Sequence, residues 1–307
     1  MILTVTLNPS LDRTYLLGPL LVGEVNRAGA DTVEASGKGV NVSWALHRAG
    51  VPTCALLPLG GTEGDQVRAL LDAGGLPYEA VPVAVPTRTN VTLVEAAGRT
   101  TKVNSPGRPL ADGEYHRLAG AIGRLAGGAA WTVFSGTLPP EADPATLPRL
   151  MAAARAAGSR IAVDASGDAL AAAVEARPDL LAPNAAELAA LTGMAVPENE
   201  LRAAIGAAAG VAARTGGGLL VSLGADGALW VAGGRARHAT PPPITPVNTA
   251  GAGDALLAGW LASADGDRLA RAVAWGTAAC LLPGTTGDVA AVADSAAVTV
   301  VDVPEPG

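Results

Sequence analysis

Short apolar strand patterns alternate with helical patterns along most of this chain, and that alternation limits the possible folds more than any other feature. Strands are predicted at residues 2–7, 53–59, 131–134, 161–163, 179–181, 219–223, 228–231 and 298–303. Helices are predicted at residues 42–50, 63–73, 112–126, 143–157, 184–192, 198–214, 254–264 and 267–281. Strands that alternate with helices in this way are typical of a parallel sheet. The sequence therefore predicts an α/β fold with a mostly parallel central sheet and helices on both faces.

Two segments do not fit this alternation. Residues 13–34 contain several glycines and a proline, and residues 88–95 and 100–104 have the pattern of two strands joined by a turn. We expect the segments 13–34 and 88–104 to form a small β-sheet lid over one edge of the main sheet. No stretch has the length and composition of a linker between two full domains. Residues 1–307 are therefore predicted to form one domain with this lid inserted.

The composition argues against several classes of function. The formal net charge of -7 and the isoelectric point near 5.0 disfavour nucleic-acid binding. No apolar run approaches the roughly 18–20 residues of a membrane span, and residues 1–7 lack the basic start of a signal peptide. Cys54 and Cys280 lie in apolar surroundings without metal-ligand spacing, which suits buried thiols in a reducing cytosol. We expect a cytoplasmic protein that binds neither nucleic acid nor membrane.

The loop at residues 248–254, Asn-Thr-Ala-Gly-Ala-Gly-Asp, is typical of a phosphate site. Its small residues leave the backbone bare, and a helix beginning at Asp254 would direct free N–H groups and the positive end of its dipole at an anion. The Asp254 carboxylate would then handle a proton beside bound phosphate. No P-loop is present, and Leu256 breaks the dinucleotide-binding pattern after Gly251 and Gly253. The alternative is that Asp254 only caps a helix.

A second candidate, Asn184-Ala185-Ala186-Glu187, enters a helix directly after Pro183. Asn184 and Glu187 lie one turn apart, and their oxygens suit Mg²⁺ held largely through water beside nucleotide phosphates. The same spacing is that of a capping box, which is the alternative. Polar and glycine motifs also follow other predicted strands, so that they would share one edge of the sheet: residues 8–12, 135–136, 164–167, 183–187 and 222–227.

The third candidate set combines cations, glycines and polar side chains: Asp12, Gly37, Lys38, Gly39, Asn41, Arg88 and Lys102. Of the 21 basic residues only Lys38 and Lys102 are lysines, and a compact lysine charge is not interchangeable with a planar arginine at a tight phosphate site. With Arg88 they would clamp a dianionic phosphate on a substrate, and Asp12 would accept hydrogen bonds from hydroxyls. Asn41 is expected to begin a helix. The set indicates a phosphorylated sugar, and the alternative is a group of separate surface charges.

Together these residues resemble the PfkB (ribokinase-like) carbohydrate kinases over nearly the whole chain, and within that family the 1-phosphofructokinases and tagatose-6-phosphate kinases. The most specific motif is Thr-Ala-Gly-Ala-Gly-Asp at residues 249–254. Further motifs lie at residues 8–12, 37–41, 87–90, 101–107, 135–140, 164–167, 183–187 and 222–227. Three positions depart from the family pattern: Ser36 stands where a glycine is usual, Ala182 where a lysine often occurs, and Asn248 where the wider family has an aspartate, although its sugar-phosphate branch varies there.

The resemblance implies a ribokinase-like fold and an ATP- and Mg²⁺-dependent kinase of a phosphoketose, with fructose 1-phosphate as the first choice. Asp254 would be the base that deprotonates the acceptor hydroxyl, and an anion hole would form at Gly251, Ala252 and Gly253. Residues implied to bind the sugar phosphate are Asp12, Gly37, Lys38, Asn41, Arg88, Lys102 and Ser135. Residues implied to bind the nucleotide are Asn184, Glu187, Ser222, Gly224 and Gly227, with Glu187 holding the metal through water. Family members often pair through the lid, so a homodimer is expected.

Other functions remain open at this point. The same site suits a tagatose-6-phosphate kinase or a 6-phosphofructokinase, because the clamp would serve a phosphate at either end of the sugar. A kinase of an unphosphorylated sugar or of a nucleoside would need no cationic clamp. A regulator that binds a sugar phosphate without chemistry would not need Asp254, Asn184 or Glu187.

Overall fold

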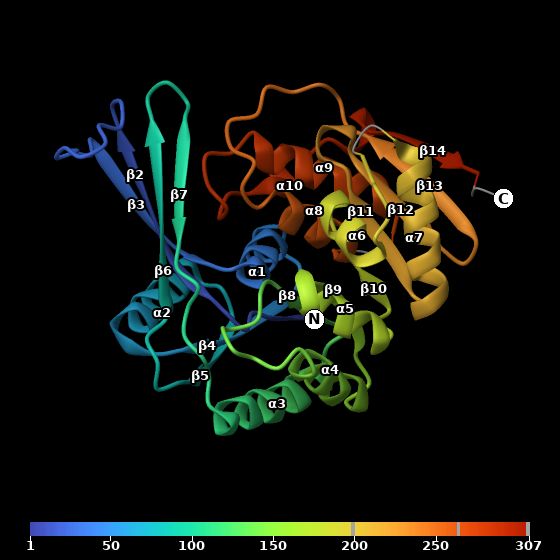
Figure 1. The fold of residues 1–307 in the computed structure, drawn as a ribbon, viewed down its shortest axis with the longest axis horizontal. Coiled ribbons are helices and arrows are strands. Elements are labelled where there is room, and N and C mark those ends of the chain that lie inside the picture. The colour runs from blue at the N-terminus through green and yellow to red at the C-terminus, as the bar shows by residue number, and fades with distance from the viewer. Residues whose placement is uncertain (198–199, 263–264, 305–307) are drawn as a thin grey trace.

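The structure is a computed structural model that describes residues 1–197, 200–262 and 265–304. Its main sheet contains a parallel part made of β5 (Tyr78–Pro82), β4 (Thr53–Leu59), β1 (Ile2–Val5), β8 (Trp131–Ser135), β9 (Arg160–Asp164), β10 (Leu180–Leu181) and β11 (Gly218–Ser222). An antiparallel extension continues from β11 through β12 (Ala228–Ala232), β13 (Arg235–Thr240) and β14 (Thr299–Val303). The order across the sheet is β14-β13-β12-β11-β10-β9-β8-β1-β4-β5. The prediction of a mostly parallel sheet is confirmed (Figure 1).

Helices cover both faces of this sheet. One face carries α3 (Asp112–Ala126), α4 (Thr146–Ala156), α5 (Gly167–Glu175), α6 (Ala185–Thr192) and α7 (Leu201–Thr215). The other face carries α1 (Lys38–Arg48), α2 (Gly61–Gly74), α8 (Ala252–Leu261), α9 (Arg268–Cys280) and α10 (Val289–Val292). Strand β9 shows the consequence, because Ile161 and Val163 enter one core while Ala162 enters the other, and all three are 0% exposed. No described helix is long and apolar enough to cross a membrane.

A second sheet of four strands forms the lid. Its strands are β2 (Ser10–Leu17), β3 (Ala30–Ser36), β6 (Arg88–Glu95) and β7 (Thr100–Asn104), in the order β3-β2-β6-β7. Strands β2 and β6 pair in parallel, so two segments far apart in the sequence lie side by side and stand away from the main sheet (Figure 1). The predicted lid segments therefore form one sheet, whose outer strand bounds are Ser10 and Ser36 rather than residues 13 and 34.

Some local predictions are wrong. Helix α8 begins at Ala252 and not at Asp254, because Gly251 takes the N-cap position with a left-handed φ of 78°. Helix α1 begins at Lys38 and not at Asn41. Helix α5 and strand β5 are missing from the predicted elements. Helix α5 is short and alanine-rich, and β5 is a half-exposed edge strand that ends in proline. The predicted helical residues 198–199 and 263–264 lie outside the described residues.

Candidate active site

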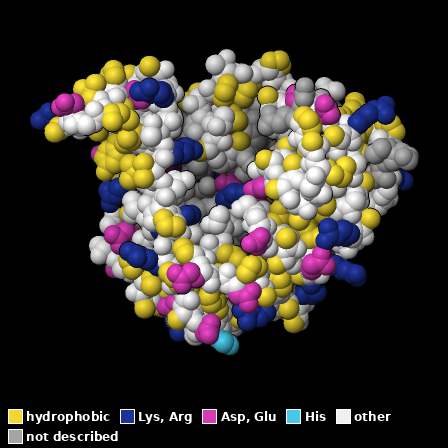
Figure 2. All heavy atoms as spheres, in the orientation of Figure 1, with side chains coloured by type: hydrophobic (Ala, Val, Ile, Leu, Met, Phe, Trp, Pro, Cys, Tyr) yellow, Lys and Arg dark blue, Asp and Glu magenta, His cyan; other side chains and the backbone are white. Residues whose placement is uncertain are grey.

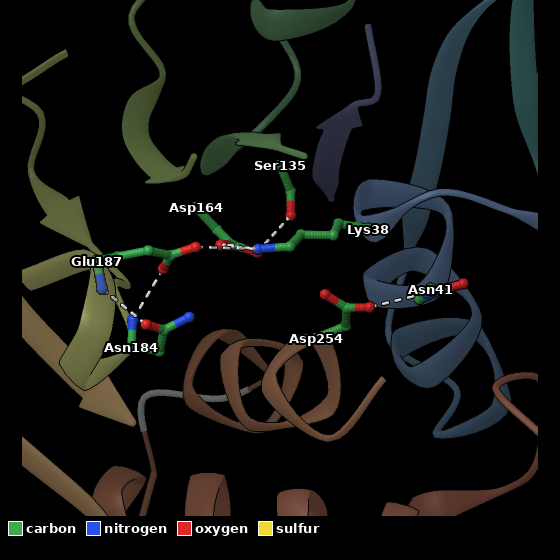
Figure 3. Close-up of polar contacts among 7 residues, drawn as sticks. All are labelled: Lys38, Asn41, Ser135, Asp164, Asn184, Glu187 and Asp254. Atoms are coloured by element: carbon green, nitrogen blue, oxygen red, sulfur yellow. Dashed lines mark hydrogen bonds and ion pairs between the residues drawn. The ribbon is translucent and has the colours of Figure 1, made fainter. Parts of the chain in front are cut away.

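The carboxyl ends of the parallel strands meet at one edge of the sheet, and many of the predicted site residues lie there. Ser135 ends β8 and Ser222 ends β11, while Asn184 follows β10 and pairs with Ser222 through an isolated β-bridge. Figure 2 shows the molecule hollowed between the lid and the C-terminal half, with basic and acidic side chains in the hollow. Figure 3 shows seven polar side chains from strand ends and helix starts directed toward one another at this edge.

Asp254 lies at the centre of this group, in the first turn of α8. It is 6% exposed, and its Oδ2 accepts a hydrogen bond of 2.8 Å from Nδ2 of Asn41 in α1 (Figure 3). The first amides of a helix have no carbonyl partner within the helix, so that of Gly253 is available to an anion, while the Ala252 amide makes a long hydrogen bond of 3.4 Å to the Thr249 carbonyl. The start of α8 thus combines an anion-binding backbone with a fixed carboxylate.

The environment of Asp254 favours its protonated form. Burial and, to a lesser extent, the nearby Asp164 carboxylate raise the pKa of Asp254 from 3.8 to about 7, although the Asn41 hydrogen bond and the Lys38 charge act to lower it. A carboxylate with a pKa near neutrality accepts a proton from a hydroxyl more readily than one with an ordinary pKa. Asp254 is therefore suited to act as a base at neutral pH.

Lys38 connects the surroundings of Asp254 to two other elements. Its Nζ lies 2.8 Å from Oδ1 of Asp164 and 3.9 Å from Oε1 of Glu187. The Ser135 hydroxyl donates to Oδ2 of Asp164 at 2.8 Å. Burial disfavours the charged form of Lys38, but the neighbouring carboxylates outweigh burial, so its pKa is raised and the ammonium stays charged. A fixed positive charge therefore lies between the strand ends and Asp254.

Asp164 is absent from the predicted site residues, although it contacts Lys38 and Ser135 and perturbs the pKa of Asp254. It is 6% exposed at the end of β9. The sequence did carry a signal for it, because residues 164–167 form one of the polar motifs that follow predicted strands. A carboxylate that ends a buried strand at the ligand-binding edge is a candidate site residue on that ground alone.

Asn184 and Glu187 form the reciprocal capping box that was the alternative to a nucleotide site. Asn184 Oδ1 accepts from the Glu187 amide at 2.8 Å, and Glu187 Oε2 accepts from the Asn184 amide at 2.9 Å. The cap fixes both side chains at the start of α6. Glu187 Oε1 is directed toward Lys38 instead (Figure 3), so capping leaves one carboxylate oxygen facing the site.

Oxygen donors for a divalent cation are few at this edge. No group of three or more His, Cys, Asp and Glu side chains could hold a metal ion within residues 1–197, 200–262 and 265–304. Mg²⁺ commonly keeps several waters and is bound through one or two carboxylates together with substrate phosphates. Glu187 Oε1 and the carboxylate of Asp164 fit that arrangement, in which side chains hold the ion mainly through its waters.

A cavity of about 680 Å³ opens beside the start of α8. Three of the residues predicted to bind nucleotide line it, namely Ser222, Gly224 and Gly227, together with the anion-hole residues Ala252 and Gly253. Helix α9 supplies another wall, and the proline-rich connection supplies a wall that the sequence analysis did not assign: Pro241, Pro242, Pro243, Ile244 and Pro246. Mostly apolar walls that end at a helix start suit a flat ring that carries phosphates.

The predicted sugar-phosphate residues of the lid share one face of its sheet. Asp12 pairs with Asn90, and Lys102 pairs with Thr92, which lies two residues further along β6. Arg88 lies two residues before Asn90 on the same strand. Because alternate residues of a strand point to the same side, the register places two cations and a carboxylate on one face of the lid.

These lid side chains are less fixed than those around Asp254. Asp12 Oδ1 accepts from Nδ2 of Asn90 at 2.9 Å. Arg88 donates from Nη1 to the Ser105 carbonyl at 2.9 Å, but its buried Nε has no hydrogen-bond partner among the described residues. Burial lowers the pKa of Arg88, and Asp12 partly offsets that effect. Lys102 is exposed, so the lid presents donors that a bound anion would satisfy.

The predicted clamp is divided between two elements, because Lys38 lies on α1 beside Asp164 and not on the lid. Glycines position Lys38 and Asn41 there. Gly37 has a φ of 126°, and a Cβ atom on Gly39 would lie 2.4 Å from Oγ1 of Thr6. Helix α1 can therefore start directly against the end of β1 only with glycine at these positions.

Comparison with known proteins identifies the family. The model described as pfkB family carbohydrate kinase matches residues 6–290. A 1-phosphofructokinase of Xanthomonas campestris pv. campestris is 37% identical over 266 residues, which cover 85% of this chain and 83% of the relative. The crystal structure of phosphofructokinase-2 from Escherichia coli in complex with fructose-6-phosphate matches with a TM-score of 0.86 and 30% identity over 95% of this chain and 97% of that chain. Ribokinase from Arabidopsis thaliana, complexed with ribose and ATP, shares the fold with a TM-score of 0.72 and 20% identity over 96% of each chain.

A parallel α/β sheet with a β lid over a helix start is the ribokinase-like fold, and the fold prediction is confirmed. The chain belongs to the pfkB family of carbohydrate kinases, as the resemblance of its motifs indicated. It is therefore a phosphotransferase with an alcohol group as acceptor.

Proposed function

We propose that the chain is an ATP-dependent 1-phosphofructokinase, which converts fructose 1-phosphate to fructose 1,6-bisphosphate. The observation that carries this proposal is the place of Asp254, which directly follows two residues that line a cavity of about 680 Å³ and is hydrogen-bonded to Asn41 of α1. The relative of that name, at 37% identity, supports the choice of substrate. An ATP-dependent reaction on a sugar phosphate suits the cytoplasm.

The proposed reaction transfers a phosphoryl group in line. The sugar hydroxyl gives its proton to Asp254 while its oxygen forms a bond to the γ-phosphorus of ATP. The bond between that phosphorus and the β–γ bridging oxygen breaks, and ADP leaves. Amides at residues 251–253 and the Lys38 ammonium would stabilise the charge on the transferring group.

Mg²⁺, when bound, neutralises charge on the β- and γ-phosphates. Glu187 would hold it through a bound water with Oε1, the carboxylate oxygen that capping leaves directed at the site. Asn184 would act on the nucleotide side by fixing the start of α6 beside Ser222.

The lid would bind the sugar phosphate. Arg88 and Lys102 would contact its phosphate, and Asp12 would accept hydrogen bonds from its hydroxyls. The Nε of Arg88 supports this role, since it is buried without an acceptor among the residues that the structure describes, and such a donor is unfavourable until a ligand supplies one. Lid closure would also exclude water and so limit hydrolysis of ATP.

A coupled ADP-release assay tests the substrate. The purified protein is supplied with ATP, Mg²⁺ and, in separate arms, fructose 1-phosphate, fructose 6-phosphate, tagatose 6-phosphate and free fructose. We expect the highest kcat/KM with fructose 1-phosphate and the lowest with free fructose. Preference for free fructose would contradict the cationic clamp, and no activity in any arm would contradict the proposal as a whole.

A 6-phosphofructokinase is the second candidate, because the matching structure of phosphofructokinase-2 is a complex with fructose-6-phosphate. The same lid cations would then bind a phosphate at the other end of the sugar. The fructose 6-phosphate arm of the assay separates the two candidates directly.

We also propose a homodimer formed through the lid. The face opposite Asp12 carries a group of apolar side chains, with Val91 paired to Val103 and Leu93 on the same side. Val103 is 60% exposed, and hydrophobic side chains gather over the lid in Figure 2. Light scattering should give about twice the 30.2 kDa of one chain, and Val103→Asp should reduce the mass to that of a monomer.

A further inference from the structure

A second cavity lies at the opposite edge of the main sheet, where the parallel strands begin. It has a volume of about 370 Å³, and the first residues of β8 and β9, the turn before β11, the end of α8 and the start of α9 line it. Three arginines and three tryptophans stand in its wall: Trp131, Arg160, Arg177, Trp230, Trp260 and Arg268. The candidate active site lies at the carboxyl ends of the same strands, so the two sites are separate.

The charge in this cavity is unbalanced. The Arg160 guanidinium carbon lies 4.2 Å from the Trp131 ring centroid, and that of Arg268 lies 5.9 Å from the Trp260 centroid. Asp179 is the acid in the wall, and its Oδ2 accepts a backbone amide of β9 at 2.8 Å. Over the part of the chain that the structure describes, no ion pair joins any of the three cavity arginines to a carboxylate. Positive charge thus gathers here in a chain whose net charge is -7.

The backbone at Arg177 is strained. Its φ is 52°, a left-handed conformation that glycine adopts freely after a helix end and that other residues adopt at a cost. Arg155 holds this turn in place by donating to the carbonyls of Ala176 at 3.1 Å and Arg177 at 2.7 Å. An exposed arginine thus stands where glycine would be favoured, and contact between its guanidinium and a ligand would account for that choice.

The aromatic wall is built by close packing. The rings of Trp230 and Trp260 lie 4.1 Å apart between centroids, and Trp230 is partly exposed to the cavity. A Cβ atom on Gly218 would lie 1.9 Å from Cη2 of Trp230, so only glycine admits the indole at this place. A cavity with guanidinium groups and one accessible indole face suits a compact organic molecule that carries several negative charges.

Helices α8 and α9 and strand β11 each connect this cavity to the cavity of about 680 Å³ beside the start of α8, which we call the nucleotide-side cavity. One end of each element lines the present cavity, at Trp260, Arg268 and Gly218. The other end lines the nucleotide-side cavity, at Gly253, Thr277 and Ser222. Helices and strands in a close-packed core move as units, so a ligand that shifts one end of an element also acts on the other end. By linkage, nucleotide and second ligand would change each other's affinity by the same factor.

We infer that this second cavity, which we call the Arg/Trp cavity after the three arginines and three tryptophans in its wall, binds a compact organic polyanion bearing phosphate or carboxylate groups. Binding of that ligand would alter the affinity for ATP. Phosphate and carboxylate ligands share the chemistry that arginine recognises, so both are tested. The inference does not depend on which sugar phosphate is the substrate.

Binding is measured from tryptophan fluorescence and by calorimetry at constant ionic strength, with inorganic pyrophosphate and tricarballylate as separate probes. The test variant is Arg177→Gly with Arg268→Gln, since glycine suits the left-handed turn and protects folding. The matched control is Arg202→Gln with Arg235→Gln, two exposed arginines outside the cavity. We expect saturable binding of at least one probe to wild type and control, and affinity at least about tenfold weaker in the test variant. Equal binding in both double variants, or no saturable binding to wild type, would overturn the inference.

Kinetics test the connection to the active site. With free Mg²⁺ held constant, the bound probe should change the KM for ATP at least threefold in wild type and in the control, and less than that in the test variant. Competition at the active site would affect both double variants alike, so the difference between them reports the second cavity. Binding without a change in KM would show that the cavity is not coupled to the nucleotide.

Discussion

The nucleotide side and the sugar side of the candidate active site are built in different ways. On the nucleotide side, strand ends and helix starts hold every polar side chain, and Asp164 and Asp254 are each 6% exposed. On the sugar side, Lys102 stands exposed on the outer strand of a four-stranded lid, and Arg88 keeps one buried donor without a partner among the described residues. Around Asp254 the charged side chains are paired with one another, whereas Arg88 and Lys102 on the lid make no ion pair among the described residues.

This difference follows from the chemistry of phosphoryl transfer. Positioning and charge stabilisation supply most of the catalysis, so the groups around the γ-phosphate benefit from a rigid setting. The lid must admit the sugar and then exclude water, so it benefits from contacts that form only with substrate. Substitutions on the nucleotide side should therefore lower kcat, whereas substitutions on the lid should raise KM.

The largest effect is expected for Asp254→Asn. Asparagine keeps the shape of the side chain but cannot accept the hydroxyl proton, so kcat should fall by roughly 10²–10⁴ while both KM values change little. Steady-state ADP release measures these constants. Asp168→Asn, an exposed aspartate at the start of α5, serves as the control and should keep the wild-type rate. Near-wild-type turnover in Asp254→Asn would mean that another group is the base.

Lid variants should show the opposite pattern. Arg88→Ala and Lys102→Ala should each raise the KM for the sugar phosphate about 10- to 100-fold, because each removes a charge-assisted contact, and should leave kcat within a few-fold. Arg13→Ala is the matched control, since Arg13 lies on the opposite face of β2 and donates to Gln66. If neither variant changes KM, the lid does not hold the phosphate.

The pH dependence should report the nucleotide side. Protonated Asp254 cannot act as a base, and its pKa is raised to about 7, so kcat/KM should fall about tenfold per pH unit below that value. The residual kcat/KM of Asp254→Asn should not show this fall below pH 7. A wild-type profile that stays level from pH 8 to pH 6 would contradict the raised pKa of Asp254.

The two sides also differed in how far the sequence could predict them. The exact sequence bounds of β6, β7 and α3 follow from local pattern, and the motifs that follow predicted strands place Ser135, Asn184 and Ser222 at one edge of the sheet. Parallel strands make this possible, because their carboxyl ends must meet. Pairing of Lys38 with Asp164 could not be predicted, since it joins residues 126 positions apart and depends on the packing of α1 against the sheet.

Other parts of the site carry weaker sequence signals. The proline-rich connection lines the nucleotide-side cavity through its path in space, and proline composition by itself indicates only a loop. Asn184 and Glu187 satisfy a capping box and face the site together, so the two interpretations of that spacing are compatible. The Arg/Trp cavity draws its residues from segments that show no common motif in the sequence.

The smallest predicted effect concerns the free energy of unfolding, and it tests whether the nucleotide side is held at a cost in stability. The pKa of Asp254 is about 7 in the folded chain and near 3.8 when unfolded, so the folded state binds more protons between these values. Its contribution to stability therefore declines as pH rises from about 4 to 7, and the full cost of the buried charge is present at pH 8.

Asp254→Asn removes that charge and should raise the free energy of unfolding by about 1–3 kcal/mol at pH 8, with little gain near pH 4. Urea unfolding at pH 4 and pH 8 measures the free energy of unfolding of each variant relative to wild type. The control Asp168→Asn should change that free energy by less than about 0.5 kcal/mol at either pH. A gain that is equal at the two pH values would indicate better packing of the amide, because only a change in charge depends on pH in this way.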